Sequence, residues 1–268
     1  MLDMKYYERY YFSKSKCVPY QLKCGVEINI YPILVEDIET FEDCIDILLI
    51  DKDSIDDPNI IKMKYIEFLK NIQFNLSEKI EGTNLTYGQN QQIKFITLMT
   101  LCLKEDYVDI DYDKNKCVVV IGEEKDDKYI LKAKITNKEF EEISKIILYQ
   151  NIRDYDDKKL DPTVQKLYED YIRLKNKDFR NPEIEEKKEY IMAHNGWGED
   201  KINKLTYRRF CGIFDCLIGD ALYYGNKIIE GSEKFECKKV STHFMFEKKQ
   251  NKYDDFVVNG DSIKDKIG

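Results

Sequence analysis

The sequence predicts an α+β fold that is mainly helical, with a small N-terminal β-hairpin and a central three-stranded antiparallel meander. Two observations predict this class. Apolar residues recur every three or four positions over most of the chain, as on one face of a helix, but alternate with polar residues within 17–31 and 107–135, as in strands. The polar acidic stretch NIRDYDDKKL then marks a boundary. We therefore expect an N-terminal α+β domain (1–150), a helical C-terminal domain (151–230) and a charged tail (231–268) that is a candidate partner-docking segment.

The first expected elements are a hairpin and three helices. Apolar and polar residues alternate in GVEINI (25–30), which indicates a hairpin with one solvated face. Helical spacing follows over 38–49 and resumes after Asp57-Pro58 as far as Leu69, so we expect two antiparallel helices there. The helix expected from about Gln89 to Leu103 carries so many apolar residues that it should be buried on most sides.

The central region changes to a period of two. The runs VDIDY, KCVVVIG and YILKAKI are separated by the polar turns DKNK and EEKDDK, which predicts three antiparallel strands. Thr136 then begins T-N-K-E, a capping box in which Thr136 and Glu139 satisfy each other's backbone N–H groups. This box predicts the start of the helix FEEISKIILYQ.

The helices of the C-terminal domain are punctuated by proline and glycine. Asp161-Pro162 and Asn181-Pro182 each place a capping side chain before a proline at a first helical position. Asn195-Gly196 is a helix end, because both residues tolerate the left-handed conformation. A last amphipathic helix follows Thr206; its apolar residues are Phe210, Cys211, Phe214, Leu217, Ile218, Ala221 and Leu222. Arg208-Arg209 at its start suggests a helix-turn-helix reader of DNA, but the helix that follows is apolar and acidic, so we expect it to pack in a core.

The candidate protein-binding residues are aromatic or apolar side chains in polar surroundings. They are Trp197, Phe244, Met245, Phe246, Tyr253 and Phe256. Trp197, the sole tryptophan, either wedges between neighbouring helices or anchors a partner, and packing is the favoured alternative. The other five lie in the charged tail, which is either a docking segment or a pair of late strands.

No catalytic, cofactor-binding or metal-ligating residues are expected. Asp109, Asp111 and Asp113 have the spacing that starts a calcium loop, but Lys114 replaces the required glycine and Val120 the final glutamate, so a solvated strand edge is favoured. The eight cysteines contain no Cys-x-x-Cys pair. The two histidines, His194 and His243, lack the neighbours of a nucleophile pair.

The composition narrows the classes of partner. The net charge of −8 argues against a general nucleic-acid or anionic-membrane surface. No apolar run is long enough to span a bilayer, and the start, MLDMKYYERYYF, lacks the layout of a signal peptide. We therefore expect a cytoplasmic protein that binds neither nucleic acid nor membrane.

Several short motifs, in this order, resemble those of phage and prophage proteins of Firmicutes that are encoded just before the tail tape measure protein. They are IIKMKYIEFL, the linker DYDD-x-x-LDP, an L-x-N-K helix end, the helix start LTYRRF and the patch HFMFE. The matching positions run from about Val18 to Phe246. Proteins of this family are regarded as tail assembly chaperones.

The resemblance implies a non-enzymatic protein in the cytoplasm of the bacterial host. It would escort the tape measure protein during assembly of a long or contractile tail, recruit tail tube subunits and be absent from the finished virion. Its expected partners are the tape measure protein, the tail tube protein and, as an open alternative, further copies of itself. A virion structural protein, such as a baseplate or tail-completion component, is the alternative function, and an enzyme that uses His194 or His243 is the third.

Overall fold

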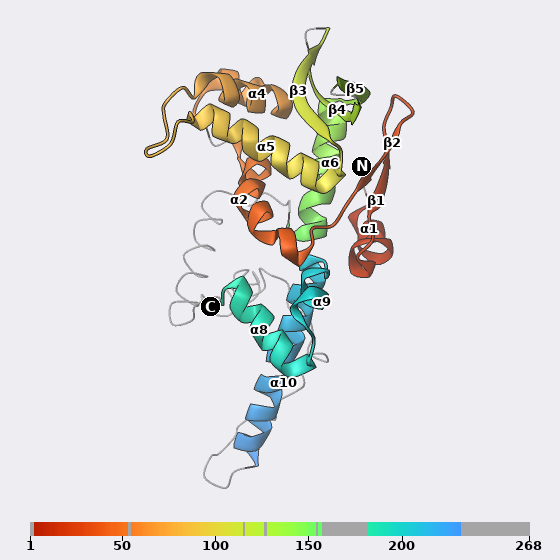
Figure 1. The fold of residues 1–268 in the computed structure, drawn as a ribbon, viewed down its shortest axis with the longest axis vertical. Helices are drawn as coiled ribbons and strands as arrows, with labels where there is room; N and C mark the ends of the chain where they lie inside the picture. The colour runs from red at the N-terminus through yellow and green to blue at the C-terminus, as the bar shows by residue number, and fades with distance from the viewer. Residues whose placement is uncertain are drawn as a thin grey trace, which may run out of the picture. The chain divides into compact units, whose positions relative to one another are not determined.

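A computed structural model describes residues 3–52, 55–114, 116–125, 128–153, 155–156 and 182–231. It confirms the α+β class, with a two-stranded and a three-stranded antiparallel sheet among many helices (Figure 1). The chain forms two compact units, Met1–Asp156 with Glu199–Cys211, and Asp157–Gly198 with Gly212–Gly268. The helix expected after Asp161-Pro162 and the whole tail beyond Gly231 lie outside the described residues.

The N-terminal hairpin is confirmed. Strands β1 (Val18–Gln21) and β2 (Glu27–Ile30) pair antiparallel, with Val18 opposite Ile30. Val18, Ile28 and Ile30 are buried while the intervening residues are exposed or half-buried, which is the alternation that the sequence predicts. The hairpin follows helix α1 (Met4–Tyr10) and the short 3₁₀ helix η1 (Phe12–Lys14).

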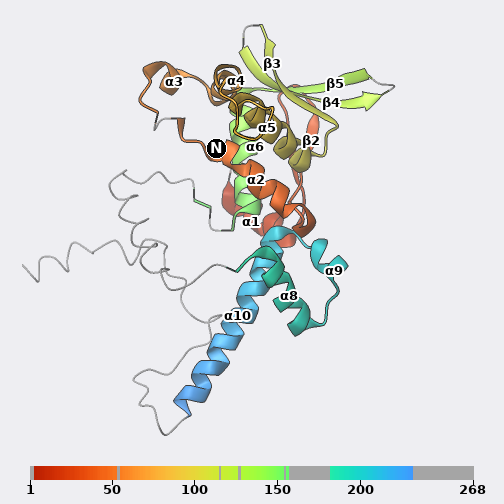
Figure 2. The same cartoon turned by 60° about the vertical axis from the view of Figure 1, so that its left-hand side comes forward.

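The central meander is also confirmed. Strands β3 (Tyr107–Asp113), β4 (Lys116–Lys125) and β5 (Lys128–Ile135) form an antiparallel sheet in the order β3-β4-β5. The central strand is buried continuously from Cys117 to Gly122, in keeping with its unbroken apolar run. A bulge at Ile121/Gly122 shifts the register with β5, and Figure 2 shows the β4–β5 hairpin reaching beyond the helices.

Helix α5 (Tyr87–Leu103) packs against α2 (Ile38–Leu49), α4 (Tyr65–Asn75) and β3. Its second half is enclosed as expected, since Phe95, Leu98, Met99, Cys102 and Leu103 are buried. The 3₁₀ helix η2 (Val35–Asp37) leads into α2. Helices α2 and α4, which lie at the positions of the expected helix pair, each pack on α5.

The helix predicted after Asp57-Pro58 is interrupted. Asp57 caps α3 (Pro58–Lys62) as expected, but Met63 is extended and a new helix, α4, starts at Tyr65. The Glu67 carboxylate accepts from the N–H of Lys64, and the Asn137 side chain accepts from the N–H of Ile66 at 3.0 Å. Because Asn137 is 71 residues away in the sequence, this helix start depends on a contact that local patterns do not reveal.

Helix α6 (Asn137–Asn151) supplies the centre of the first unit. Its predicted capping box is confirmed, because Glu139 accepts from the N–H of Thr136 at 2.9 Å. Phe140 is fully buried, with its ring centroid 5.9 Å from that of Phe95 and 6.4 Å from that of Tyr65. At the other end of the helix, the buried Asn151 side chain accepts from the N–H of Ile33 at 2.8 Å.

Glu139 also joins α6 to the loop of the hairpin, where it accepts from the N–H of Lys23 at 2.7 Å. Burial acts to raise the pKa of this carboxyl, but the hydrogen bonds from Lys23 and Thr136 outweigh it and hold the pKa below the ordinary 4.5. A lowered pKa stabilises the fold above the unfolded-state value and loses that contribution as the pH falls through the folded-state value. We therefore expect Glu139→Gln to cost about 1–3 kcal/mol of unfolding free energy at pH 7.

The pH dependence checks this assignment. Urea unfolding of the two proteins between pH 7 and pH 3 should show the difference shrinking once the pH falls below 4.5, because the carboxyl of the unfolded chain then takes up a proton while the native carboxylate stays ionised. A difference that stays constant over this range would mean that the charge of Glu139 contributes nothing to stability.

Residues 199–211 belong to the first unit, whereas the sequence analysis assigns them to the 151–230 domain. Leu205 accepts from the N–H of Val35, and the N–H of Tyr207 donates to the carbonyl of Ile33. The Arg208 guanidinium donates to the Tyr149 carbonyl at 2.7 Å and to the Glu8 carboxylate at 2.6 Å. These bonds hold Arg208 in the first unit, and the short helix α9 (Glu199–Asn203) of the same unit buries Ile202.

The second unit contains α8 (Ile184–Asn195) and most of α10 (Tyr207–Glu230), whose first turn belongs to the first unit. The prediction that Asn181-Pro182 starts a helix is wrong by two residues. Glu183 is the N-cap, and the Glu186 carboxylate accepts from its N–H at 2.9 Å. The predicted end is confirmed: Gly196 has φ 63° and donates its N–H to the Met192 carbonyl.

Candidate protein-binding surface

Helix α10 is amphipathic over its whole length. Apolar residues follow one another at intervals of four and three on one side; they are Phe210, Phe214, Leu217, Ala221, Tyr224 and Ile228. Of the 24 residues in the helix, only Phe210 is buried. The sequence therefore builds an apolar side that the described residues cover only near the start of the helix.

Within the second unit, α8 covers Phe214. The rings of Tyr190 and Phe214 meet edge to face with centroids 5.7 Å apart, and the Lys187 ammonium lies 5.8 Å from the Phe214 centroid. Beyond this point the large side chains are exposed. The accessible fractions are 63% for Leu222, 65% for Tyr224, 76% for Ile228 and 47% for Ile229. Tyr224 and Ile228 lie on the apolar side of the helix, and we call these two residues the α10 surface.

The opposite side of α10 is largely polar, although Leu222 and Ile229 lie near it. Asn226 is exposed there, and Lys227 and Glu230 form an ion pair of 2.7 Å one turn apart. Four large apolar side chains within two turns are more than the scattered exposure usual for a soluble protein. Core packing, which the sequence analysis expects for this helix, holds for Phe210 but is wrong for Leu222.

The other predicted site residues separate into two groups. Trp197 is half-buried in the segment after α8. Phe244, Met245, Phe246, Tyr253 and Phe256 lie outside the described residues, so the structure does not bring them together with Trp197. The α10 surface adds Tyr224 and Ile228, which were not among the predicted site residues.

His194 has the ordinary role of a residue at a helix end. Its Nδ1 lies 2.9 Å from the carbonyl oxygen of Tyr190 one turn earlier, and the two rings are in contact with centroids 4.0 Å apart. His243, the other histidine considered for catalysis, lies outside the described residues.

The aspartates of the calcium-like motif lie on strand β3. The Asp109 carboxylate accepts from the N–H of Ile110, and the Asp111 carboxylate accepts from the N–H of Tyr112, both at 2.7 Å. They bind the backbone of their own strand. Over the described ranges, His, Cys, Asp and Glu side chains form no group of three that could hold a metal ion.

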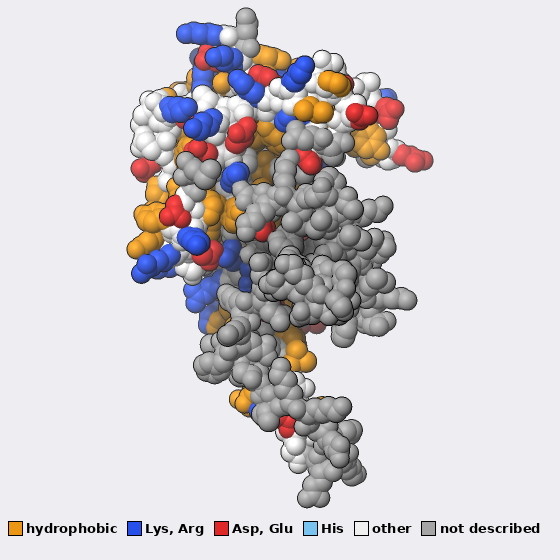
Figure 3. Space-filling model, turned by 180° about the vertical axis from the view of Figure 1, so that it is seen from behind, with side chains coloured by type: hydrophobic (Ala, Val, Ile, Leu, Met, Phe, Trp, Pro, Cys, Tyr) orange, Lys and Arg blue, Asp and Glu red, His pale blue; other side chains and the backbone are white. Residues whose placement is uncertain are grey.

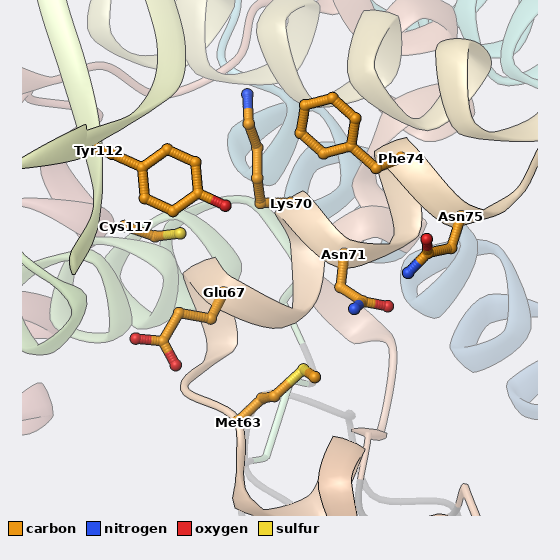
Figure 4. Close-up of a pocket in the computed structure, with 8 residues that line it drawn as sticks. All are labelled: Met63, Glu67, Lys70, Asn71, Phe74, Asn75, Tyr112 and Cys117. Atoms are coloured by element: carbon orange, nitrogen blue, oxygen red, sulfur yellow. The ribbon is translucent and has the colours of Figure 1, made fainter. Parts of the chain in front are cut away.

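A hollow of about 310 Å³ lies between α4 and the β3–β4 turn (Figure 4). Its lining residues are Met63, Glu67, Lys70, Asn71, Phe74, Asn75, Tyr112 and Cys117. The Lys70 ammonium donates to the Ile110 carbonyl at 2.6 Å and lies 5.1 Å from the centre of the Phe74 ring. Figure 4 shows the Glu67 carboxylate directed away from this ammonium.

The groups in this hollow are not arranged for nucleophilic catalysis. Burial raises the pKa of the Cys117 thiol, so the sulfur carries its proton at neutral pH and is a poor nucleophile. The Lys70 ammonium is held by a carbonyl oxygen and an aromatic face. The hollow therefore ranks below the α10 surface as a functional site.

The surface outside these sites is mixed. Figure 3 shows Lys and Arg side chains lying beside Asp and Glu side chains, with hydrophobic side chains between them, over the described part of one side. None of the described helices combines the length and apolar composition that a membrane span requires.

No protein-family model matches the chain, and searches of curated proteins and of solved structures return no significant match.

Proposed function

We propose that the protein is a non-enzymatic tail assembly chaperone, which binds the tape measure protein and tail tube subunits while the tail is built. The observation that supports protein binding is the exposure of the α10 surface. The resemblance of the sequence motifs supports the choice of client. Trp197 and the aromatic residues of the tail, from Phe244 to Phe256, are further candidate contacts.

The chemistry of the α10 surface suits a helical client. An amphipathic helix binds by placing its apolar side against a complementary apolar surface, with anchors spaced along successive turns. Tyr224 and Ile228 are one turn apart, and both are more than half exposed. Burying a side chain of this kind contributes about 1.5–3 kcal/mol, and about 1.4 kcal/mol corresponds to a tenfold change in Kd.

The test is co-expression with the tape measure protein, followed by co-purification and measurement of Kd. Ile228→Asp should weaken the complex by about tenfold or more, because it replaces a buried apolar contact with a charge. Asn226→Asp is the matched control: it adds the same charge on the polar side of α10 and should leave Kd unchanged. Circular dichroism should show equal helicity in both variants.

Two results would contradict the proposal. One is failure of the wild-type chain to associate with the tape measure protein. The other is a stoichiometric copy of the chain in purified virions, which would favour a baseplate or tail-completion component instead. Equal weakening by both substitutions would exclude the α10 surface as the contact.

A further inference from the structure

The two edges of the central sheet are built differently. At β3, Ile110 and Tyr112 are two residues apart and present their backbone groups on the same side of the strand. Both N–H groups are taken by the preceding aspartates, and the Ile110 carbonyl accepts from the Lys70 ammonium. Side chains of β3 and of α4 therefore occupy backbone groups that another strand would need, and this edge is closed to strand pairing.

The edge at β5 is open. Over the described residues, β5 pairs with β4 alone, and neither a backbone group nor a side chain bonds to its outer side. Its first five residues, KYILK, are all exposed, with accessible fractions of 59% for Tyr129, 52% for Ile130 and 53% for Leu131. An exposed edge strand with apolar side chains is a template for a further strand.

A side-chain contact within the sheet holds the exposed part of β5 in place. The rings of Tyr107 on β3 and Tyr129 on β5 stack with centroids 4.5 Å apart, across the central strand where Gly122 has no side chain. Figure 2 shows this part of the hairpin lying away from the helices, so a strand could approach it without displacing them. An ordered edge of this kind limits the conformational entropy that β5 itself loses when a partner binds.

The positive charge of β5 favours an acidic partner strand. The strand carries Lys128, Lys132 and Lys134 and no acidic residue. Lys132 and Lys134 pair with Glu105 and Asp113, whereas the described residues offer Lys128 no partner. A second copy paired antiparallel through β5 would bring lysines close to lysines, which is unfavourable. An acidic strand would instead place opposite charges across the pair.

We propose that the β5 edge binds an extended segment of a partner protein in which acidic and apolar residues alternate. The partner strand adds to the sheet beside β5, so that its backbone bonds to the outer N–H and C=O groups of β5. Its apolar residues cover Tyr129 and Leu131 on one face of the sheet, and its carboxylates lie near Lys128 on the other face. This surface lies in the first unit and does not depend on the α10 surface or on its client.

A synthetic peptide tests this directly. The probe has the 8 residues of β5 in length, alternates Glu and Val, and carries a fluorophore for anisotropy. It should bind the full-length protein and slow hydrogen exchange of the β5 amides. A peptide of alternating Lys and Val should bind at least about fivefold more weakly, as should the acidic peptide with every second backbone nitrogen methylated.

Matched variants complete the test. Lys128→Glu should weaken the binding of the acidic peptide by about fivefold and strengthen the binding of the basic peptide. Lys116→Glu, which makes the same change on the central strand at the other end of the sheet, should leave both affinities unchanged. Equal binding of the acidic, basic and methylated peptides would overturn the proposal. Protection of the β5 amides that rises with protein concentration alone would also overturn it, because the occupant would then be a second copy.

Discussion

Replacing Phe140 by alanine is expected to lower the free energy of unfolding by about 3–5 kcal/mol. The side chain is fully buried and its ring contacts those of Phe95 on α5 and Tyr65 on α4. Helices α4 and α5 therefore lose their shared contact with α6, and the space left behind cannot close without moving these helices. The loss is the sum of the transfer free energy of the ring and the cost of the cavity.

Urea unfolding followed by circular dichroism measures this effect. The control is Phe74→Ala on α4, a ring that is 69% exposed and contacts the Lys70 ammonium. Its loss should cost about 1 kcal/mol or less. Similar losses in the two variants would show that Phe140 is not at the centre of the core.

The sequence predicts the start of the helix that carries Phe140 but not the start of the helix that carries Phe74. Period and capping signals predict the helix that carries Phe140, because the capping box of Thr136 and Glu139 is a local pattern. The hairpin, the meander and the end of α8 at Gly196 are local for the same reason. The sequence does not reveal that a new helix starts at Tyr65, because this start depends on Asn137. It also does not reveal that residues 199–211 pack beside Ile33 and Val35.

The candidate sites illustrate the same limit. An apolar pattern predicts that α10 has an apolar side but not whether the fold covers it, so Phe210 and Leu222 look alike in the sequence and differ in exposure. The aspartates of β3 were correctly interpreted as a strand edge. The sequence does not show that these aspartates bond the outer N–H groups of β3 while the edge at β5 is open. This difference follows from the order of the strands.

Gly88→Ala should be the second large effect, because it disturbs the closest approach between α4 and α5. A Cβ atom at this position would lie 2.3 Å from the carbonyl oxygen of Gln73 and 3.1 Å from that of Ile72. Both are backbone atoms, so the two helices must separate. The N–H of Gly88 also donates to the Leu76 carbonyl at 2.9 Å, and that bond would lengthen as they part.

The expected loss is about 1–3 kcal/mol, the usual cost of overpacking, even though alanine favours a helix over glycine by about 1 kcal/mol. Gly225→Ala in α10 isolates that opposing term, since a Cβ there meets nothing within 4 Å. Hydrogen exchange should therefore become faster in α4 and α5 for Gly88→Ala and slower in α10 for Gly225→Ala. If both substitutions slowed exchange, helix propensity would outweigh the contact, and the close approach of α4 to α5 would not be a constraint on the fold.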